Sequence, residues 1–139
     1  MTRMPAWVDD YRGRPFRLGA RGPDAYDCYG LVRAVLRDRW NADVPALDGL
    51  EALGTPERFR AASAAEDDLW IAAEPPRPGD VLTFMLDGLH VGVVVAEGWM
   101  LHARSRLGVA TSRYDQMPWA AVRVGPAYRH HALTDPVMR

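Results

Sequence analysis

The spacing of apolar residues changes along this chain, from a period of 3.6 residues to a period of two. The residues with the helical period are Leu31, Val32, Val35, Leu36 and Trp40. They fall on one side of a helical spiral, which predicts an amphipathic helix of about three turns. Asp27 stands directly before this stretch, in the position of a helix N-cap. A second helix is predicted from Thr55 to about Glu66, because Thr55 can cap it and Pro56 suits the first helical position.

After a proline-rich turn at 75–79, apolar and polar residues alternate, as they do in a strand with one buried face. The predicted strands are residues 80–86, 89–95, 99–104, 109–113 and 120–124. Asp87-Gly88 is typical of a hairpin turn between the first two. A helix followed by an antiparallel meander predicts an α+β fold, in which residues 1–139 form a single domain.

The two ends of the chain show no sustained period. Residues 1–26 are rich in Gly, Pro and Arg and are predicted to be an irregular arm, and residues 125–139 a loosely held tail. The arm carries Trp7, Tyr11 and Phe16. These aromatic residues could dock a partner, or they could cover the apolar side of the predicted sheet. The tail is a second candidate for docking.

Composition and charge exclude several classes of function. The chain has 139 residues, of which 48% are hydrophobic and 25% charged, and its net charge is -1, so nothing favours nucleic acid as a partner. Residues 1–10 lack the apolar core of a signal peptide, and the longest apolar run, 91–96, is too short to span a membrane. We therefore expect a protein made in the cytoplasm without membrane insertion.

Cys28 is the single cysteine and cannot form an internal disulfide. A lone cysteine is most often a small buried apolar residue, but Cys28 lies on the first turn of the predicted helix. Free backbone N–H groups and the helix dipole favour a negative charge there, so we expect a lowered thiol pKa and a nucleophilic sulfur. The same N–H groups could hold the oxyanion that forms when the sulfur attacks a carbonyl.

A thiol nucleophile needs a base, and two of the four histidines lie in predicted strands, at His90 and His102. A two-residue turn at 97–98 would place them on opposite faces of the hairpin. A three-residue loop at 96–98, with Gly98 in the left-handed conformation, would place them diagonally on the same face. The second register also makes one face of the hairpin wholly apolar, so we predict that His90 and His102 are neighbours on the other face.

Three segments resemble the successive motifs of the NlpC/P60 cysteine peptidases. They are Asp27-Cys28-Tyr29-Gly30-Leu31-Val32, then Pro78-Gly79-Asp80, then His90-Val91-Gly92-Val93 with Leu101-His102-Ala103. The resemblance spans about residues 11–115. It implies a papain-like fold and cleavage of peptidoglycan stem peptides, often next to a D-glutamyl residue, without a cofactor. Mapped onto this chain, it makes Cys28 the nucleophile, His90 the base and His102 the group that orients His90.

The segment Gly22-Pro23-Asp24, together with Tyr29, resembles the phage-tail branch of this family, which includes gene-transfer-agent tails. That resemblance implies phage-like tail or baseplate proteins as partners, a place in a virion or tail, and action in the cell wall. Two positions depart from the cellular members: Phe16 stands where they have Tyr, and Tyr29 where they have Ser. The resemblance assigns substrate-binding roles to both, Phe16 and Tyr29.

Three alternatives remain at this point. Thiolate and imidazole are good zinc ligands, so Cys28, His90 and His102 could form a zinc site, although the usual close ligand spacings are missing. The chain could be a structural tail protein that uses the peptidase fold only as a scaffold. It could also be an acyltransferase on a related permuted fold.

Overall fold

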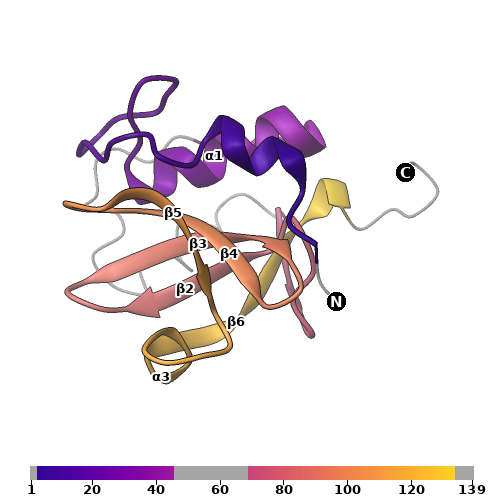
Figure 1. The fold of residues 1–139 in the computed structure, drawn as a ribbon. Helices are drawn as coiled ribbons and strands as arrows, with labels where there is room; N and C mark the ends of the chain where they lie inside the picture. The colour runs from indigo at the N-terminus through magenta and orange to yellow at the C-terminus, as the bar shows by residue number, and fades with distance from the viewer. Residues whose placement is uncertain (1–2, 46–68, 134–139) are drawn as a thin grey trace.

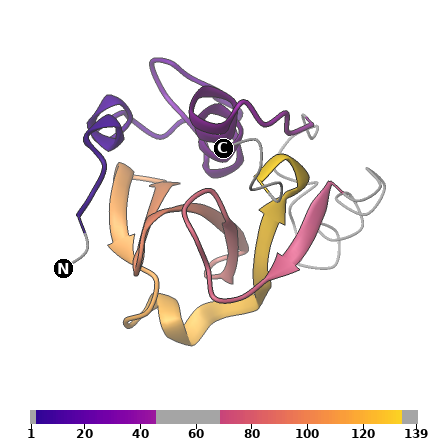
Figure 2. The ribbon, with the colours of Figure 1, turned by 90° about the vertical axis from the view of Figure 1, so that its right-hand side faces the viewer.

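The computed structural model describes residues 3–45 and 69–133. It contains one six-stranded antiparallel sheet, in the order β1-β6-β2-β3-β4-β5, and the helix α1, which packs against β3 and β4. Figure 1 shows α1 on one side of this sheet and the short helix α3 on the other, and Figure 2 shows how strongly the sheet curls between them. The elements are η1 (Ala6–Asp10), α1 (Cys28–Trp40), β1 (Trp70–Ala73), β2 (Val81–Met85), β3 (Leu89–Ala96), β4 (Trp99–Arg104), β5 (Gly108–Arg113), α3 (Trp119–Val122), β6 (Arg123–His130) and η3 (His131–Leu133).

The predicted α+β fold is confirmed, as are the first helix and four of the five predicted strands. Asp27 caps α1 as expected, because its side chain accepts a hydrogen bond from the backbone N–H of Gly30 at 2.6 Å. A second bond from the N–H of Gly19, at 2.9 Å, ties the preceding loop to the same carboxylate. These two bonds hold Cys28 on the first turn of the helix. The predicted second helix, residues 55–66, lies outside the described residues.

The hairpin of β3 and β4 has the register that brings His90 and His102 together. Val93 pairs with Leu101 and Val94 with Met100, as predicted for the three-residue alternative. The register shifts between Val94 and Ala96, and Gly98 has a φ of 84°, in the left-handed region. A bulge beside the turn therefore produces the offset that the longer loop was expected to give.

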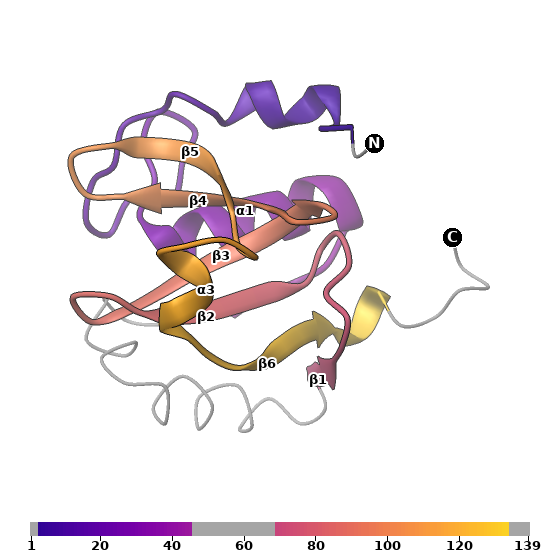
Figure 3. The same cartoon turned by 60° about the horizontal axis from the view of Figure 1, so that its bottom comes forward.

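The prediction for the C-terminal part was wrong. Residues 119–122 form α3 rather than a strand, and β6 runs from Arg123 to His130, into the first part of the predicted tail. β6 lies inside the sheet, between β1 and β2, as Figure 3 shows. A strand with neighbours on both sides is part of the fold, so the described part of the tail is not a free docking segment.

The N-terminal arm also belongs to the folded core. Val8 is fully buried and Tyr11 is 3% exposed, while Trp7 and Phe16 are half-buried against the same cluster of apolar residues. Backbone hydrogen bonds join Gly13 and Arg14 of the arm to Val109 on β5. The arm therefore covers the edge of the sheet, which would otherwise present unpaired backbone groups. This arrangement favours the covering role over a docking role for its aromatic residues.

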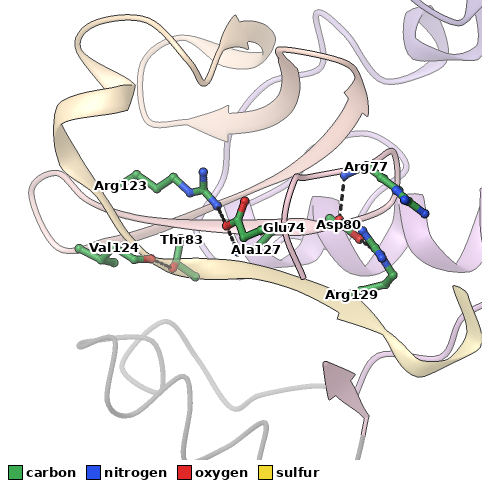
Figure 4. Close-up of polar contacts among 8 residues, drawn as sticks. All are labelled: Glu74, Arg77, Asp80, Thr83, Arg123, Val124, Ala127 and Arg129. Atoms are coloured by element: carbon green, nitrogen blue, oxygen red, sulfur yellow. Dashed lines mark hydrogen bonds and ion pairs between the residues drawn. The ribbon is translucent and has the colours of Figure 1, made fainter. Parts of the chain in front are cut away.

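Two carboxylates, Asp80 just before β2 and Glu74 just after β1, form the polar contacts that hold β6 between these strands, as Figure 4 shows. The guanidinium of Arg129 donates to both carboxylate oxygens of Asp80, at 2.9 and 2.8 Å, and Asp80 is fully buried. Asp80 also accepts from the backbone N–H of Arg77 at 2.8 Å. Nearby, Glu74 accepts from Arg123 and from the N–H of Ala127.

Arg129→Ala should destabilise the fold by about 3 kcal/mol, because it leaves the carboxylate of Asp80 buried without its cation. Arg37→Ala is the matched control, since its ion pair with Asp38 is exposed and should contribute about 0.5 kcal/mol or less. Urea unfolding of both variants measures the two free energies. Equal, small losses would show that the Arg129–Asp80 pair does not anchor β6.

Candidate active site

Cys28 and His90 line the same cleft. It has a volume of about 540 Å³ and lies where the N-terminus of α1 meets β3, the β2–β3 turn and the β4–β5 turn. Its lining also includes Phe16, Leu86, Asp87, Leu89, Ala103, Arg104, Ser105, Arg106 and Trp119. A cleft of this size that brings a thiol and an imidazole together is a candidate for a small-ligand or peptide site. Among the described residues, no cluster of His, Cys, Asp and Glu has the geometry of a metal site.

The two histidines and a serine form a chain of hydrogen bonds. Nε2 of His90 lies 2.8 Å from Nδ1 of His102, and Nε2 of His102 lies 2.8 Å from Oγ of Ser112. His90 and His102 are therefore neighbours, as the sequence predicted. Because Nε2 of His90 is bonded to His102, its Nδ1 is the ring nitrogen that can accept a proton from the thiol.

This chain selects one tautomer for a His90 that acts as a base. Nδ1 of His90 must then lack a proton, so Nε2–H of His90 donates to Nδ1 of His102. His102 in turn carries its proton on Nε2 and donates it to Oγ of Ser112. Each ring thus orients the next one, and Ser112 is the last acceptor.

Trp119 covers the histidine pair from α3. Its ring is stacked on His90, at 5.3 Å between centroids and 29° between planes, and meets His102 edge-on at 4.9 Å. Trp119 is 5% exposed and His102 is 2% exposed, whereas His90 is half-buried and lines the cleft. Burial lowers the pKa of His90 to about 4, and the nearby charge of Arg104 acts in the same direction. Burial, the charge of His90 and that of Arg104 likewise lower the pKa of His102.

The thiol of Cys28 differs from the sequence-based expectation. Cys28 is 4% exposed, and burial raises its pKa to about 11, against the lowering that its place on the helix predicts. Hydrogen bonds with backbone groups of Val91, Tyr29 and Cys28 itself oppose this rise but do not overcome it. The shifts of both pKa values therefore favour the neutral thiol and the neutral imidazole.

Of the two expected substrate-binding residues, the structure brings one to the cleft. Phe16 lines it, whereas Tyr29 is buried in the core on the first turn of α1, and its hydroxyl donates to the carbonyl of Pro45 at 2.7 Å. Sequence reasoning missed Ser112 and Trp119. Ser112 is diagonal to His102 across β4 and β5, and only the register of that strand pair could have revealed it.

Comparison with known proteins decides the family. The sequence profile described as "NlpC/P60 family" matches residues 13–127, which include the helix of Cys28 and both histidine strands. This chain belongs to the NlpC/P60 family. The shared segment covers nearly the whole described sheet, so the cleft described above lies within the family's conserved domain.

Relatives and solved structures agree with this assignment. The chain is 28% identical over 117 residues to the probable endopeptidase NlpC of Escherichia coli, which covers 81% of this chain. It is 23% identical over 120 residues to the murein DD-endopeptidase MepS/murein LD-carboxypeptidase of E. coli, covering 85%. The structure of NlpC1 from Trichomonas vaginalis superposes with a TM-score of 0.59 at 25% identity, covering 89% of this chain.

The matched region is only part of each of these proteins. It corresponds to 67% of E. coli NlpC, 57% of MepS and 41% of the Trichomonas chain. Within the part of this chain that the structure describes, no helix is long and apolar enough to cross a membrane.

Proposed function

We propose that this NlpC/P60 domain is a cysteine endopeptidase that cleaves the stem peptides of peptidoglycan. The observation that carries the proposal is the cleft that Cys28 and His90 line together, with His90 hydrogen-bonded to His102 and His102 to Ser112. A buried thiol, a base oriented by a second ring and a first helical turn are the parts that thiol-dependent acyl transfer needs. The name of the first E. coli relative supports endopeptidase activity, and the name of the second, a murein DD-endopeptidase, supports the substrate class.

The reaction follows from the geometry of these groups. As the substrate carbonyl arrives, Nδ1 of His90 takes the proton of Cys28, and the sulfur attacks the carbonyl carbon. Backbone N–H groups on the first turn of α1 stabilise the oxyanion. The protonated His90 then gives its proton to the leaving amine, and a water molecule activated by the same ring hydrolyses the thioester. His102 stabilises the imidazolium, since its Nδ1 accepts the Nε2–H of His90.

The zinc alternative fits this arrangement poorly. It requires a ring nitrogen of His102 as a ligand, but both nitrogens of this ring lie within 2.8 Å of other partners, His90 and Ser112. The test measures the cleavage of a soluble stem peptide through the new amino groups that cleavage releases. We expect a chelator to leave the rate unchanged and a thiol alkylator to abolish it. If the chelator abolishes activity and the thiol alkylator does not, the site uses a metal mechanism instead of a thiol mechanism.

We further propose that the enzyme reaches the wall as a component of a phage-like tail. The support is the resemblance of Gly22-Pro23-Asp24 and Tyr29 to the phage-tail branch of the family. Within the described residues, the arm and β6 belong to the fold, so any contact that this part of the chain makes with tail or baseplate proteins would use its outer surface. Mass spectrometry of purified particles tests this placement; a complete absence of the protein from particles that its host releases would refute it.

His102→Asn should reduce kcat/KM by about tenfold to a hundredfold, less than the loss of His90. An amide at this position can still accept the hydrogen bond from Nε2–H of His90, whereas alanine cannot, so His102→Ala should cost more. Ser112→Ala should cost less than either, because it removes only the end of the chain. Steady-state kinetics on a soluble stem peptide rank the three variants. A reversed order would show that His102 does not position His90.

The acid limb of the pH profile should lie well below the ordinary histidine pKa of 6.5. A general base must be neutral, and the lowered pKa of His90 keeps its ring neutral until the pH approaches about 4. Activity should therefore persist as the pH falls through 6.5 and decline only near the lowered value. The measurement is kcat/KM of a soluble substrate between about pH 4 and 8, after a check that the fold survives. A midpoint at or above 6.5 would contradict the buried, neutral base.

A further inference from the structure

The ring of Trp119 contacts three side chains at the proposed active site. It is stacked on His90, with 5.3 Å between ring centres and 29° between planes, and it meets His102 edge-on at 4.9 Å. The guanidinium of Arg104 lies 5.2 Å from the centre of the same ring. Within the part of the chain that the structure describes, Trp119 is the one aromatic residue whose ring contacts both histidines.

The position of Trp119 is set by the fold behind the cleft. α3 begins at Trp119 and leads directly into β6, and it packs against β2, as Figure 3 shows. The ring of Phe84 on β2, which is fully buried, meets the indole edge-on at 5.1 Å. Because the indole is packed in this way and is 5% exposed, it offers the ring of His90 a fixed surface to lie against.

The proposed base needs such a surface. Nδ1 of His90 must stay free for the thiol proton, and Nε2 is already bonded to His102 at 2.8 Å. One hydrogen bond leaves the tilt of the imidazole open, because the last torsion of a histidine side chain has a broad energy minimum. A contact with the face of the ring fixes this tilt without using either nitrogen. The stacked indole of Trp119 makes this contact.

We propose that Trp119 is a positioning residue of the proposed peptidase, whose indole fixes the plane of the His90 ring and leaves Nδ1 free for the thiol proton. This inference rests on the proposed function. Two contacts then orient the base between them. The hydrogen bond to His102 selects the nitrogen that carries the proton, and the stacked ring of Trp119 selects the plane in which the other nitrogen lies.

The first test observes the imidazoles directly, by nitrogen-15 NMR at neutral pH, and needs no substrate. We expect His90 of the wild type to show one tautomer, with the proton on Nε2. In Trp119→Leu, its nitrogen shifts should move towards the averaged values of a ring that exchanges between both tautomers. Trp119→Phe should keep the wild-type shifts, because a smaller ring can still stack.

Trp99→Leu is the matched control for both tests. Trp99 also lies against a guanidinium, that of Arg113 at 5.3 Å, and is half-buried, but it does not line the cleft. Its replacement therefore removes a similar ring and a similar cation–π contact without touching the histidines. The nitrogen shifts of His90 and the turnover of Trp99→Leu should both stay at the wild-type values.

The second test measures kcat and KM on a soluble stem peptide. Trp119→Leu should lower kcat by about tenfold to a hundredfold and change KM by less than about threefold, because a misplaced base slows the chemical step more than binding. Trp119→Phe should restore kcat to within about threefold of the wild type. A rise in KM with an unchanged kcat would show that Trp119 only contacts the substrate, which refutes the positioning role.

The outcomes separate the role of Trp119 from the proposed function. If folded Trp119→Leu keeps the wild-type nitrogen shifts or the wild-type kcat, the positioning role is refuted while the peptidase proposal stands. If the wild type cleaves no stem peptide, the peptidase proposal fails, and the nitrogen shifts alone decide. Loss of the single tautomer in Trp119→Leu then supports the role, whereas unchanged shifts, or a wild type without a single tautomer, overturn it.

Thermal unfolding shows whether Trp119→Leu is folded. If it is not, Trp119→Met takes its place in both tests, since the flexible side chain of methionine fills irregular apolar space without offering a ring to stack on. The same losses are expected of this variant, and wild-type shifts or a wild-type kcat in it would refute the positioning role.

Discussion

Cys28→Ala should lower kcat/KM on a soluble stem peptide by at least about 10⁴-fold. The chain has one cysteine, so no second thiol can take over the attack on the carbonyl. Ser112 stands behind His102 and accepts a hydrogen bond from it, so its hydroxyl cannot replace the sulfur. Quantification of released amines over a long incubation measures the residual rate.

The fold of this variant should remain intact. Removing one buried sulfur from the start of α1 costs about 1 kcal/mol, and the Asp27 cap on Gly30 is unaffected. Thermal unfolding serves as the control, with Cys28→Ser as a second variant that keeps the volume of the side chain. Substantial turnover by a folded Cys28→Ala protein would end the thiol mechanism.

His90→Ala should cost nearly as much, about 10³-fold to 10⁴-fold in kcat/KM. The raised pKa of Cys28 is the reason for such a large effect: a thiol with a pKa of about 11 supplies almost no thiolate near neutral pH unless a base removes its proton. A thiol with a strongly lowered pKa would depend less on the base for its attack.

His131→Ala is the matched control, since this histidine is exposed and lies in η3, away from the residues that line the cleft. It should retain the wild-type rate. The alkaline part of the pH profile offers a second check. The rate of His90→Ala should rise steeply with pH there, because the thiol then ionises without a base to remove its proton. A loss below tenfold would show that His90 is not the base.

The histidine pair could be predicted from sequence because local pattern and register determine it. One face of the β3–β4 hairpin is wholly apolar only if the pairing is offset by one residue, and this choice alone brings His90 to His102. The N-cap at Asp27 is equally local, since the capping bond spans three residues. Both features rest on interactions between positions close in the chain.

β6 could not be predicted, because long-range contacts stabilise it. Gly125 and Pro126 interrupt any alternation, and the strand is held by pairing with β1 and β2 and by the bond of Arg129 to Asp80, 49 positions away. The pKa of Cys28 was mispredicted for a similar reason. The helix terminus favours a thiolate, but the tertiary packing that buries the sulfur has the larger effect.

The central claim is that Cys28 and His90 cleave the peptides of the cell wall. Its most direct test is digestion of purified peptidoglycan by the wild type and by Cys28→Ala, with mass spectrometry of the released fragments. The wild type should release fragments that carry new amino and carboxyl ends within the stem peptide, and the variant should release none. Intact stem peptides after incubation with the folded wild-type protein, or equal fragment release by Cys28→Ala, would contradict the claim.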